Sequence, residues 1–172
     1  MKNLIIFFLL FTTINSSYSQ SLKKYDIGQS GCQAYFFCDP GTFDISHSED
    51  SSVLYQGVCT NAETHYGIIC VKLKTAIQDL PDAETMLTSY MDYLKTAFKV
   101  KSYAGYGKGH QLRNNENTLG MIDYWNDEEG RNWKVKGWTD GKFMAVLYAY
   151  SSKELTETKV NVFLDGLVLP KQ

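Results

Sequence analysis

Four cysteines, Cys32, Cys38, Cys59 and Cys70, are the residues whose type and spacing best support chemistry. Their even number suits two disulfides in an oxidising compartment. Three pairings are possible, and closeness in sequence favours Cys32–Cys38 and Cys59–Cys70. A zinc site is the alternative, but the intervening five, twenty and ten residues match no C-x2-C knuckle. A nucleophilic cysteine would need a histidine and a third group beside it, and no spacing identifies them.

Three histidines, His47, His65 and His110, offer a second kind of chemistry, which is metal binding or acid–base catalysis. All three fall in predicted loops, and none belongs to an H-x3-H or H-E-x-x-H pair. The acidic run at 123–129 lacks the spacing of a calcium loop, and no G-x-S-x-G elbow is present. The sequence therefore predicts no catalytic residue, no metal site and no cofactor.

Aromatic side chains make up 14% of the chain and supply the candidate binding residues. Flat rings with polar tips give a large contact area for a sugar, a lipid or a protein at a modest entropy cost. The alternative is that these rings fill the core of a small domain. The residues assigned to ligand binding are Tyr106, Trp125, Trp138 and Phe143.

The first nineteen residues have the pattern of an export signal. Lys2 supplies the positive charge, 4–11 is an unbroken apolar run, and Ser17 and Ser19 suit a signal-peptidase cut before Gln20. As a helix the apolar run rises roughly 12 Å, far less than the ~30 Å of a hydrocarbon core. We therefore predict a cleaved signal peptide at 1–19, a single domain at 20–172, and a secreted or periplasmic protein.

Charge and hydropathy exclude two classes of partner. The formal net charge is −2, with 17 basic and 19 acidic residues, so no basic stripe for nucleic acid is expected. No later stretch is apolar enough to span a membrane. The expected partner is an unidentified protein or small molecule.

The elements that position these residues follow from turn signals and hydrophobic spacing. Val53–Thr60 and Tyr66–Lys74 predict a hairpin with its turn at 61–65. Pro81 and Asp82 suit the first turn of a long helix, and apolar residues recur at helical spacing as far as Phe98. Upstream, the stretch 20–49 is expected to be rich in loops, with a short strand at Gln33–Phe37.

The second half of the chain predicts an antiparallel meander between a strand at Val100–Tyr106 and a C-terminal helix at Lys153–Leu169. Gly166 is expected to end that helix, with 167–169 extended. The class is therefore α+β. The three strands of the meander are Thr118–Trp125, Arg131–Trp138 and Lys142–Ser151.

The turns of the meander predict which side chains share a face. A two-residue turn at Asp140-Gly141 would pair Trp138 with Phe143. A loop at 127–130 would pair Ile122 with Val135, Tyr124 with Trp133 and Asp123 with Lys134. One face is then apolar, whereas the second mixes charged residues with aromatic ones. The second face is either covered by another element or binds something. The expected second face comprises Asp123, Trp125, Asn132, Lys134, Lys136, Trp138, Phe143 and Leu147.

This layout resembles the Mog1/PsbP-like α/β/α sandwich superfamily over 118–169. The resemblance implies helices on both sheet faces, which would make Trp125, Trp138 and Phe143 core or half-core residues. It also implies a role in binding or assembly and no shared catalytic residues. The segments that carry the resemblance are 119–124, 133–135, 140–148 and 162–167.

Together these features predict an exported, non-enzymatic binding or assembly module that uses a sheet face and its adjacent loops. The first alternative is a small exported hydrolase that combines His47, His65 or His110 with nearby carboxylates. The second is a structural protein of the cell envelope.

Overall fold

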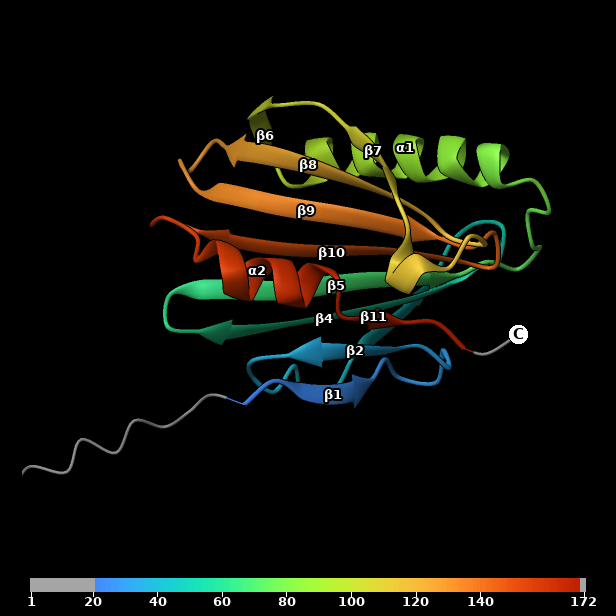
Figure 1. Ribbon diagram of the computed structural model, residues 1–172, viewed down its shortest axis with the longest axis horizontal. Helices are drawn as coiled ribbons and strands as arrows, with labels where there is room; N and C mark the ends of the chain where they lie inside the picture. The colour runs from blue at the N-terminus through green and yellow to red at the C-terminus, as the bar shows by residue number, and fades with distance from the viewer. Residues whose placement is uncertain (1–20, 171–172) are drawn as a thin grey trace, which may run out of the picture.

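The computed structural model describes residues 21–170, so the predicted leader at 1–19 lies outside the described residues. The described chain is an α+β protein with two helices, an 8-stranded antiparallel sheet and a 3-stranded sheet, as predicted for its class (Figure 1). The helices are α1 (Leu80–Ala97) and α2 (Glu157–Leu164), and a short 3-10 turn covers Leu112–Asn114. The strands are β1 (Lys23–Asp26), β2 (Gln33–Phe36), β3 (Asp44–His47), β4 (Val53–Asn61), β5 (Thr64–Lys72), β6 (Val100–Tyr103), β7 (Gly107–His110), β8 (Leu119–Asp127), β9 (Asn132–Thr139), β10 (Phe143–Ser151) and β11 (Leu167–Val168).

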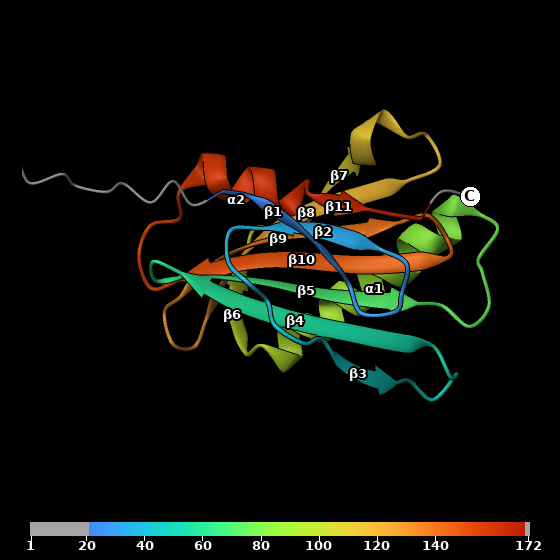
Figure 2. The same ribbon diagram turned by 90° about the horizontal axis from the view of Figure 1, so that it is seen from below.

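The large sheet has a helix on each face. Its strand order is β3-β4-β5-β10-β9-β8-β6, and β7 pairs with β8 beside β6. Helix α1 packs against β9, β8 and β6 on one face, whereas α2 and the small sheet β1-β2-β11 cover the other (Figures 1 and 2). The core is accordingly divided into two hydrophobic clusters, one on each side of the large sheet.

Helix α1 forms where the sequence predicts it. Pro81 occupies its first turn and Asp82 places negative charge near its positive end. Its buried stripe includes Leu87 and Met91, which pack on β9 above Gly137. A Cβ at Gly137 would lie 2.7 Å from the Met91 sulfur, so the glycine permits this close approach. Neither of the described helices is long and apolar enough to cross a membrane.

The β4–β5 hairpin is also confirmed, with a tighter turn than expected. Asn61 pairs with Thr64, so only Ala62 and Glu63 form the turn. Both have positive φ, 50° and 61°, as a two-residue type I′ turn requires.

The β8–β9 register differs by one residue from the prediction. Asp123 lies opposite Val135, and Trp125 lies opposite Trp133. The reason is the side chain of Asp127, which accepts hydrogen bonds from the backbone N–H of Glu129 (3.0 Å) and of Arg131 (2.9 Å) and so extends the loop to 131. A shift of one residue moves every side chain of β8 to the other face.

The β9–β10 register is shifted by two residues, which preserves the faces. Trp138 lies opposite Ala145 instead of Phe143. Here Asp140 accepts hydrogen bonds from the N–H groups of Lys142 (2.9 Å) and Phe143 (2.7 Å), which gives a wider loop than the predicted two-residue turn.

The second sheet face is covered by helix α2. Lys134 pairs with Glu157 of α2, and Lys136 pairs with Asp165 directly after α2 at 2.6 Å. Trp138 Nε1 donates a hydrogen bond to the Leu164 carbonyl (2.9 Å). The mixed composition of this face is therefore explained by contacts within the chain.

The N-terminal third and the C-terminal helix depart from the predictions. The expected loop region contains β1 and β3 as well as the predicted β2, and the predicted strand at Val100–Tyr106 is shorter, ends at Tyr103 and is followed by β7. Helix α2 is shorter than predicted, but Gly166 follows its end and β11 is extended, as expected.

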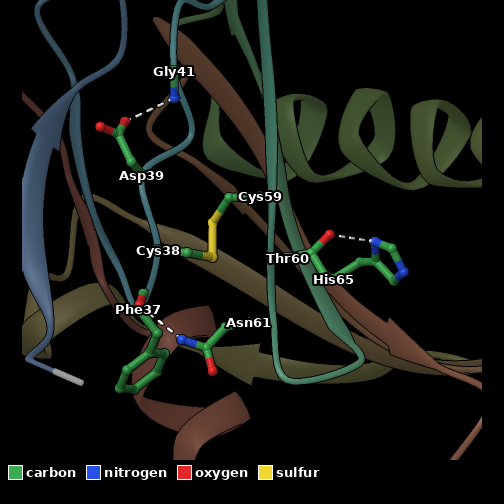
Figure 3. The surroundings of a disulfide bond; sticks show 8 residues. All are labelled: Phe37, Cys38, Asp39, Gly41, Cys59, Thr60, Asn61 and His65. Atoms are coloured by element: carbon green, nitrogen blue, oxygen red, sulfur yellow. Dashed lines mark hydrogen bonds between the residues drawn. A yellow bond between two sulfur atoms is a disulfide. The ribbon is translucent and has the colours of Figure 1, made fainter. Parts of the chain in front are cut away.

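The cysteine pairing favoured by sequence is wrong. The disulfide joins Cys38 to Cys59 (Figure 3). Cys32 and Cys70 are buried and are not joined in the structure. The four extended residues of β2 lie between Cys32 and Cys38 and alone span roughly 13 Å. Cys70 lies opposite Tyr55, four residues along the strand from Cys59, or about 13 Å. Neither predicted pair comes within the reach of a disulfide.

We expect Trp138→Ala to lower the free energy of unfolding by about 3–5 kcal/mol, because it empties a large buried site. Urea denaturation at neutral pH measures this change. Val162→Ala, at an exposed position of α2, is the control and should change stability by no more than about 0.5 kcal/mol. Equal stabilities of the two variants would contradict the placement of Trp138 in the core.

Candidate functional site

The aromatic residues predicted to bind a ligand do not form an exposed surface. Trp125, Trp138 and Phe143 are only 1%, 2% and 8% exposed, and they pack in the two core clusters. Their interpretation as core residues is therefore correct, and that of a bare binding face is wrong. Tyr106 is half-buried and belongs to a cluster of charged groups beside α1.

This ion cluster joins α1 to the edge of the large sheet. Lys95 Nζ lies 3.1 Å from Asp123 Oδ2 and 3.2 Å from Asp92 Oδ1, and it donates a hydrogen bond to the Tyr106 hydroxyl (3.0 Å). The Tyr106 hydroxyl in turn donates to Asp92 Oδ1 (2.5 Å). The ammonium group also lies 4.0 Å from the ring centroid of Tyr103, within range of a cation–π interaction.

The buried member of the cluster, Asp123, is fully paired. Its carboxylate accepts hydrogen bonds from the N–H groups of Gly105 (2.9 Å) and Tyr124 (2.8 Å) and from Trp125 Nε1 (2.8 Å). A buried carboxylate is tolerated only when it has such partners. Asp123 therefore connects α1, the β6–β7 link and β8 through one side chain.

The cluster does not supply an acid or a base near neutral pH. Burial works to lower the pKa of Lys95, but hydrogen bonds to Tyr106, Asp123 and Asp92 outweigh it, and the pKa is raised above its ordinary value. Burial, and then the hydrogen bond to Asp92, raises the pKa of Tyr106 to about 12. Both groups hold their protons, so we interpret the cluster as a structural clamp.

A row of stacked rings crosses the far end of the same face. The centroid of Tyr150 lies 4.4 Å from that of His65 and 4.1 Å from that of Trp133, and the row continues from Trp133 to Phe98 at 5.0 Å. The Arg131 guanidinium lies 5.0 Å from the Tyr150 centroid. These stacked contacts tie β5, β10 and β9 to the residue that follows α1.

The three histidines do not assemble a site. They lie in strands instead of the predicted loops, and β3 with His47 and β7 with His110 are at opposite edges of the large sheet. His65 Nδ1 lies 2.9 Å from the Thr60 hydroxyl (Figure 3). Among residues 21–170, no group of three or more His, Cys, Asp or Glu side chains is placed to hold a metal ion.

An apolar groove of about 340 Å³ lies on the other flank of α1. Its floor is the sheet surface of Leu54, Val71 and Met144, and it opens beside α1 because the helix packs mainly over β9, β8 and β6. Its wall is α1, and two side chains at the wall are unusually exposed for their size, Met86 at 41% and Tyr93 at 63%. The remaining apolar residues that line it are Leu73 and Tyr90.

The rim of the groove is a hydrogen-bonded polar turn at Ser48–Ser52. Asp50 accepts hydrogen bonds from the Ser48 hydroxyl and from the backbone N–H (3.1 Å) and hydroxyl (2.8 Å) of Ser52. The Ser52 hydroxyl accepts a hydrogen bond from the Lys74 N–H (3.0 Å), which fixes the turn to the end of β5. The hydrogen bonds from Ser48 and then Ser52 lower the pKa of Asp50, so the rim carries an ionised carboxylate.

A larger hollow of about 420 Å³ lies on the opposite face beside α2, but its lining is less suited to a ligand. Both of its lysines are already paired, Lys134 with Glu157 and Lys153 with Glu63. The groove beside α1 is therefore the better candidate site.

Sequence reasoning did not identify the groove. The helical spacing of Met86 and Tyr90 was visible, but it predicts packing against a sheet equally well. Tyr93 lies off the buried stripe, and a tyrosine at such a position is the one feature of the sequence that points to an exposed aromatic ring beside α1. The floor could not be predicted, because nothing local in the sequence indicates which half of the sheet α1 leaves uncovered.

Comparison with known proteins adds no relative to this description: the chain matches no protein-family model and no curated protein sequence.

Removal of the buried carboxylate should weaken the fold much more than removal of a surface one. We expect Asp123→Ala to reduce the free energy of unfolding by about 3–5 kcal/mol, because it leaves Lys95 without its buried partner. The matched control is Glu84→Ala, which breaks the partly exposed pair between Glu84 of α1 and Lys108 of β7 and should cost less than about 1 kcal/mol. Urea denaturation compares the two variants, and similar losses would contradict the clamp.

Stability should also fall at alkaline pH. The pKa of Tyr106 rises from 10.0 to about 12 on folding, so its contribution is fully present below pH 10 and is lost as the pH rises towards 12. We expect the urea midpoint of Tyr106→Phe to fall less steeply than that of the wild type across this window. Parallel profiles for the two proteins would show that Tyr106 does not contribute.

Proposed function

We propose that this chain is an exported, non-enzymatic binding module whose site is the apolar groove beside α1. The observation that carries the proposal is the exposure of Met86 and Tyr93 above a buried apolar floor. Large apolar side chains that remain exposed next to a concave apolar surface are typical of ligand sites. This site uses a sheet face, an adjacent loop and aromatic residues, in different positions from those first predicted.

Two observations support export. The Cys38–Cys59 disulfide indicates an oxidising compartment outside the cytosol. The charged, apolar and small-residue pattern of 1–19 is that of a cleaved signal peptide. We infer a secreted or periplasmic protein.

The groove favours a small apolar or aromatic molecule over an anion. Its volume is at the lower end of the range for small-molecule sites, and its walls offer tyrosine rings and methionine side chains. The ionised Asp50 at the rim would repel a negative group and attract a positive one. We infer a neutral or cationic ligand whose apolar part fills the groove.

The arrangement of helices on both faces of an antiparallel sheet also supports a relationship to the Mog1/PsbP-like α/β/α sandwich superfamily. We propose this relationship on the layer order and on the sequence pattern of 118–169. The superfamily consists mostly of binding and assembly proteins, which agrees with the proposed role.

Binding of the neutral fluorescent probe N-phenyl-1-naphthylamine tests the site. We expect saturable binding by the wild type, and weakening by roughly tenfold or more, about 1.4 kcal/mol, in Ser89→Trp, whose new side chain would fill the groove. Thr96→Trp, at an exposed position of the same helix that does not line the groove, is the matched control and should bind like the wild type.

The charge preference has a test of its own within the same assay. The anionic probe 1-anilinonaphthalene-8-sulfonate should bind more weakly than the neutral one, and Asp50→Asn should narrow the difference. The absence of saturable binding by the wild type, or equal binding by Ser89→Trp and Thr96→Trp, would show that the groove is not the site.

A further inference from the structure

The two cysteines outside the observed disulfide are both buried in the core between β2 and the large sheet. Cys32 precedes β2 and Cys70 lies in β5, at 1% and 0% exposure in the same hydrophobic cluster. The turn that carries Cys32 packs on the cross-strand neighbour of Cys70. The Ile27 N–H donates to the Cys32 carbonyl (2.9 Å), a Cβ at Gly28 would lie 2.7 Å from the Tyr55 ring, and Tyr55 lies opposite Cys70. The Ser30 oxygen also accepts the Cys32 N–H at 3.0 Å, which holds this residue in place.

The topology brings these two cysteines to the same part of the core. Strand β2 lies over the large sheet with one cysteine beyond each end, and β4 and β5 carry Cys59 and Cys70 at separate positions along the hairpin. Cys38, beyond one end of β2, reaches Cys59 at a Cα–Cα distance of 5.8 Å, and the turn 27–32 at the other end packs on Tyr55, which lies opposite Cys70. The pair therefore depends on the same packing of β2 that the observed disulfide fixes.

We propose that Cys32 and Cys70 form a second disulfide that fastens the start of β2 to the centre of the large sheet. In the sequence, this pair encloses the Cys38–Cys59 pair. The oxidant is a disulfide, either oxidised glutathione or an exported thiol–disulfide oxidoreductase. One thiolate attacks this disulfide and forms a mixed disulfide, and the second thiolate displaces the remaining thiol. The S–S bond forms, two protons and two electrons leave the cysteines, and the oxidant is released as two thiols.

The burial of the pair indicates when the bond forms. Interaction with Cys32 and burial raise the pKa of Cys70 well above its ordinary value, so Cys70 has little reactive thiolate in the folded protein. Neither sulfur is accessible to a protein oxidant once β2 has docked. Oxidation therefore takes place during folding, and the bond is structural.

Peptide mapping of the refolded protein tests the proposal without any ligand. Reduced, unfolded protein is refolded in a buffer of reduced and oxidised glutathione, unfolded again, and treated with N-ethylmaleimide to label free thiols. Trypsin cannot resolve the pairs, because no Lys or Arg lies between Lys24 and Lys72. Chymotrypsin can, because aromatic residues separate all four cysteines: Tyr35, Phe36 and Phe37, then Phe43 and Tyr55, then Tyr66.

We expect mass spectrometry to find a peptide containing Cys32 linked to one containing Cys70, and Cys38 linked to Cys59, in the majority of molecules. Refolding in excess dithiothreitol is the control and should give four labelled cysteines. The proposal is overturned if Cys32 and Cys70 both carry the label after oxidative refolding, or if either is linked to Cys38 or Cys59.

Cysteine variants give a second test of the proposed bond. Cys32→Ser and Cys70→Ser should each retain the Cys38–Cys59 link and leave one cysteine that is labelled only after unfolding. The double variant Cys32→Ala/Cys70→Ala should unfold at a lower urea concentration than the oxidised wild type; equal midpoints would also contradict the bond. The inference rests on the proposed export only for its occurrence in cells, so the mapping can fail or succeed whatever the groove binds.

Discussion

The position of helix α1 depends on the buried ion pair between Lys95 and Asp123. A carboxylate with no exposed surface holds the ammonium group of the helix, three N–H donors and the link between β6 and β7 together. An ion pair of this kind is not a strong source of stability, but a broken one is severely unfavourable, so it specifies one arrangement. Because the pair lies on one flank of α1, the helix packs mainly over β8 and β9 and less over β4 and β5. The groove is a consequence of this asymmetry.

The second face of the sheet shows the same principle with less burial. Lys134 and Lys136 lie under α2, and their carboxylate partners on or beside α2 are half exposed. Together with the hydrogen bond from Trp138 to Leu164, they reinforce the apolar packing of a short helix whose Val160, Phe163 and Leu164 are buried. A sheet face that carries lysines and a tryptophan can thus be buried, provided that the element covering it supplies carboxylates and a carbonyl group.

Local patterns in the sequence predict the main helices and strands, but they do not predict the register in which the strands pair. The long helix, the first hairpin and the meander follow from spacing and turn residues, and the structure contains all three. The side chains of Asp127 and Asp140 enlarge the two meander loops by accepting backbone hydrogen bonds, and no pattern of hydrophobicity reports that. Because the loop at Asp127 is one residue longer than predicted, the prediction placed Asp123 and Trp125 on the wrong face of the sheet. The cysteine pairing failed because proximity in sequence is misleading across an extended strand such as β2. The candidate groove required knowledge of which half of the sheet α1 covers, and this is set by a long-range contact.

The two edges of the large sheet differ from its centre. At one edge β3 is four residues long and fully exposed, with Asp44 and His47 at its ends. At the other, the edge is divided between β6 and β7, and both have irregular pairing with β8. Sheets that end in long, straight, apolar strands recruit further strands from neighbouring molecules and grow into fibrils. Here each border is brief, polar or broken, so the architecture resists self-polymerisation at high concentration while it keeps eight strands in register.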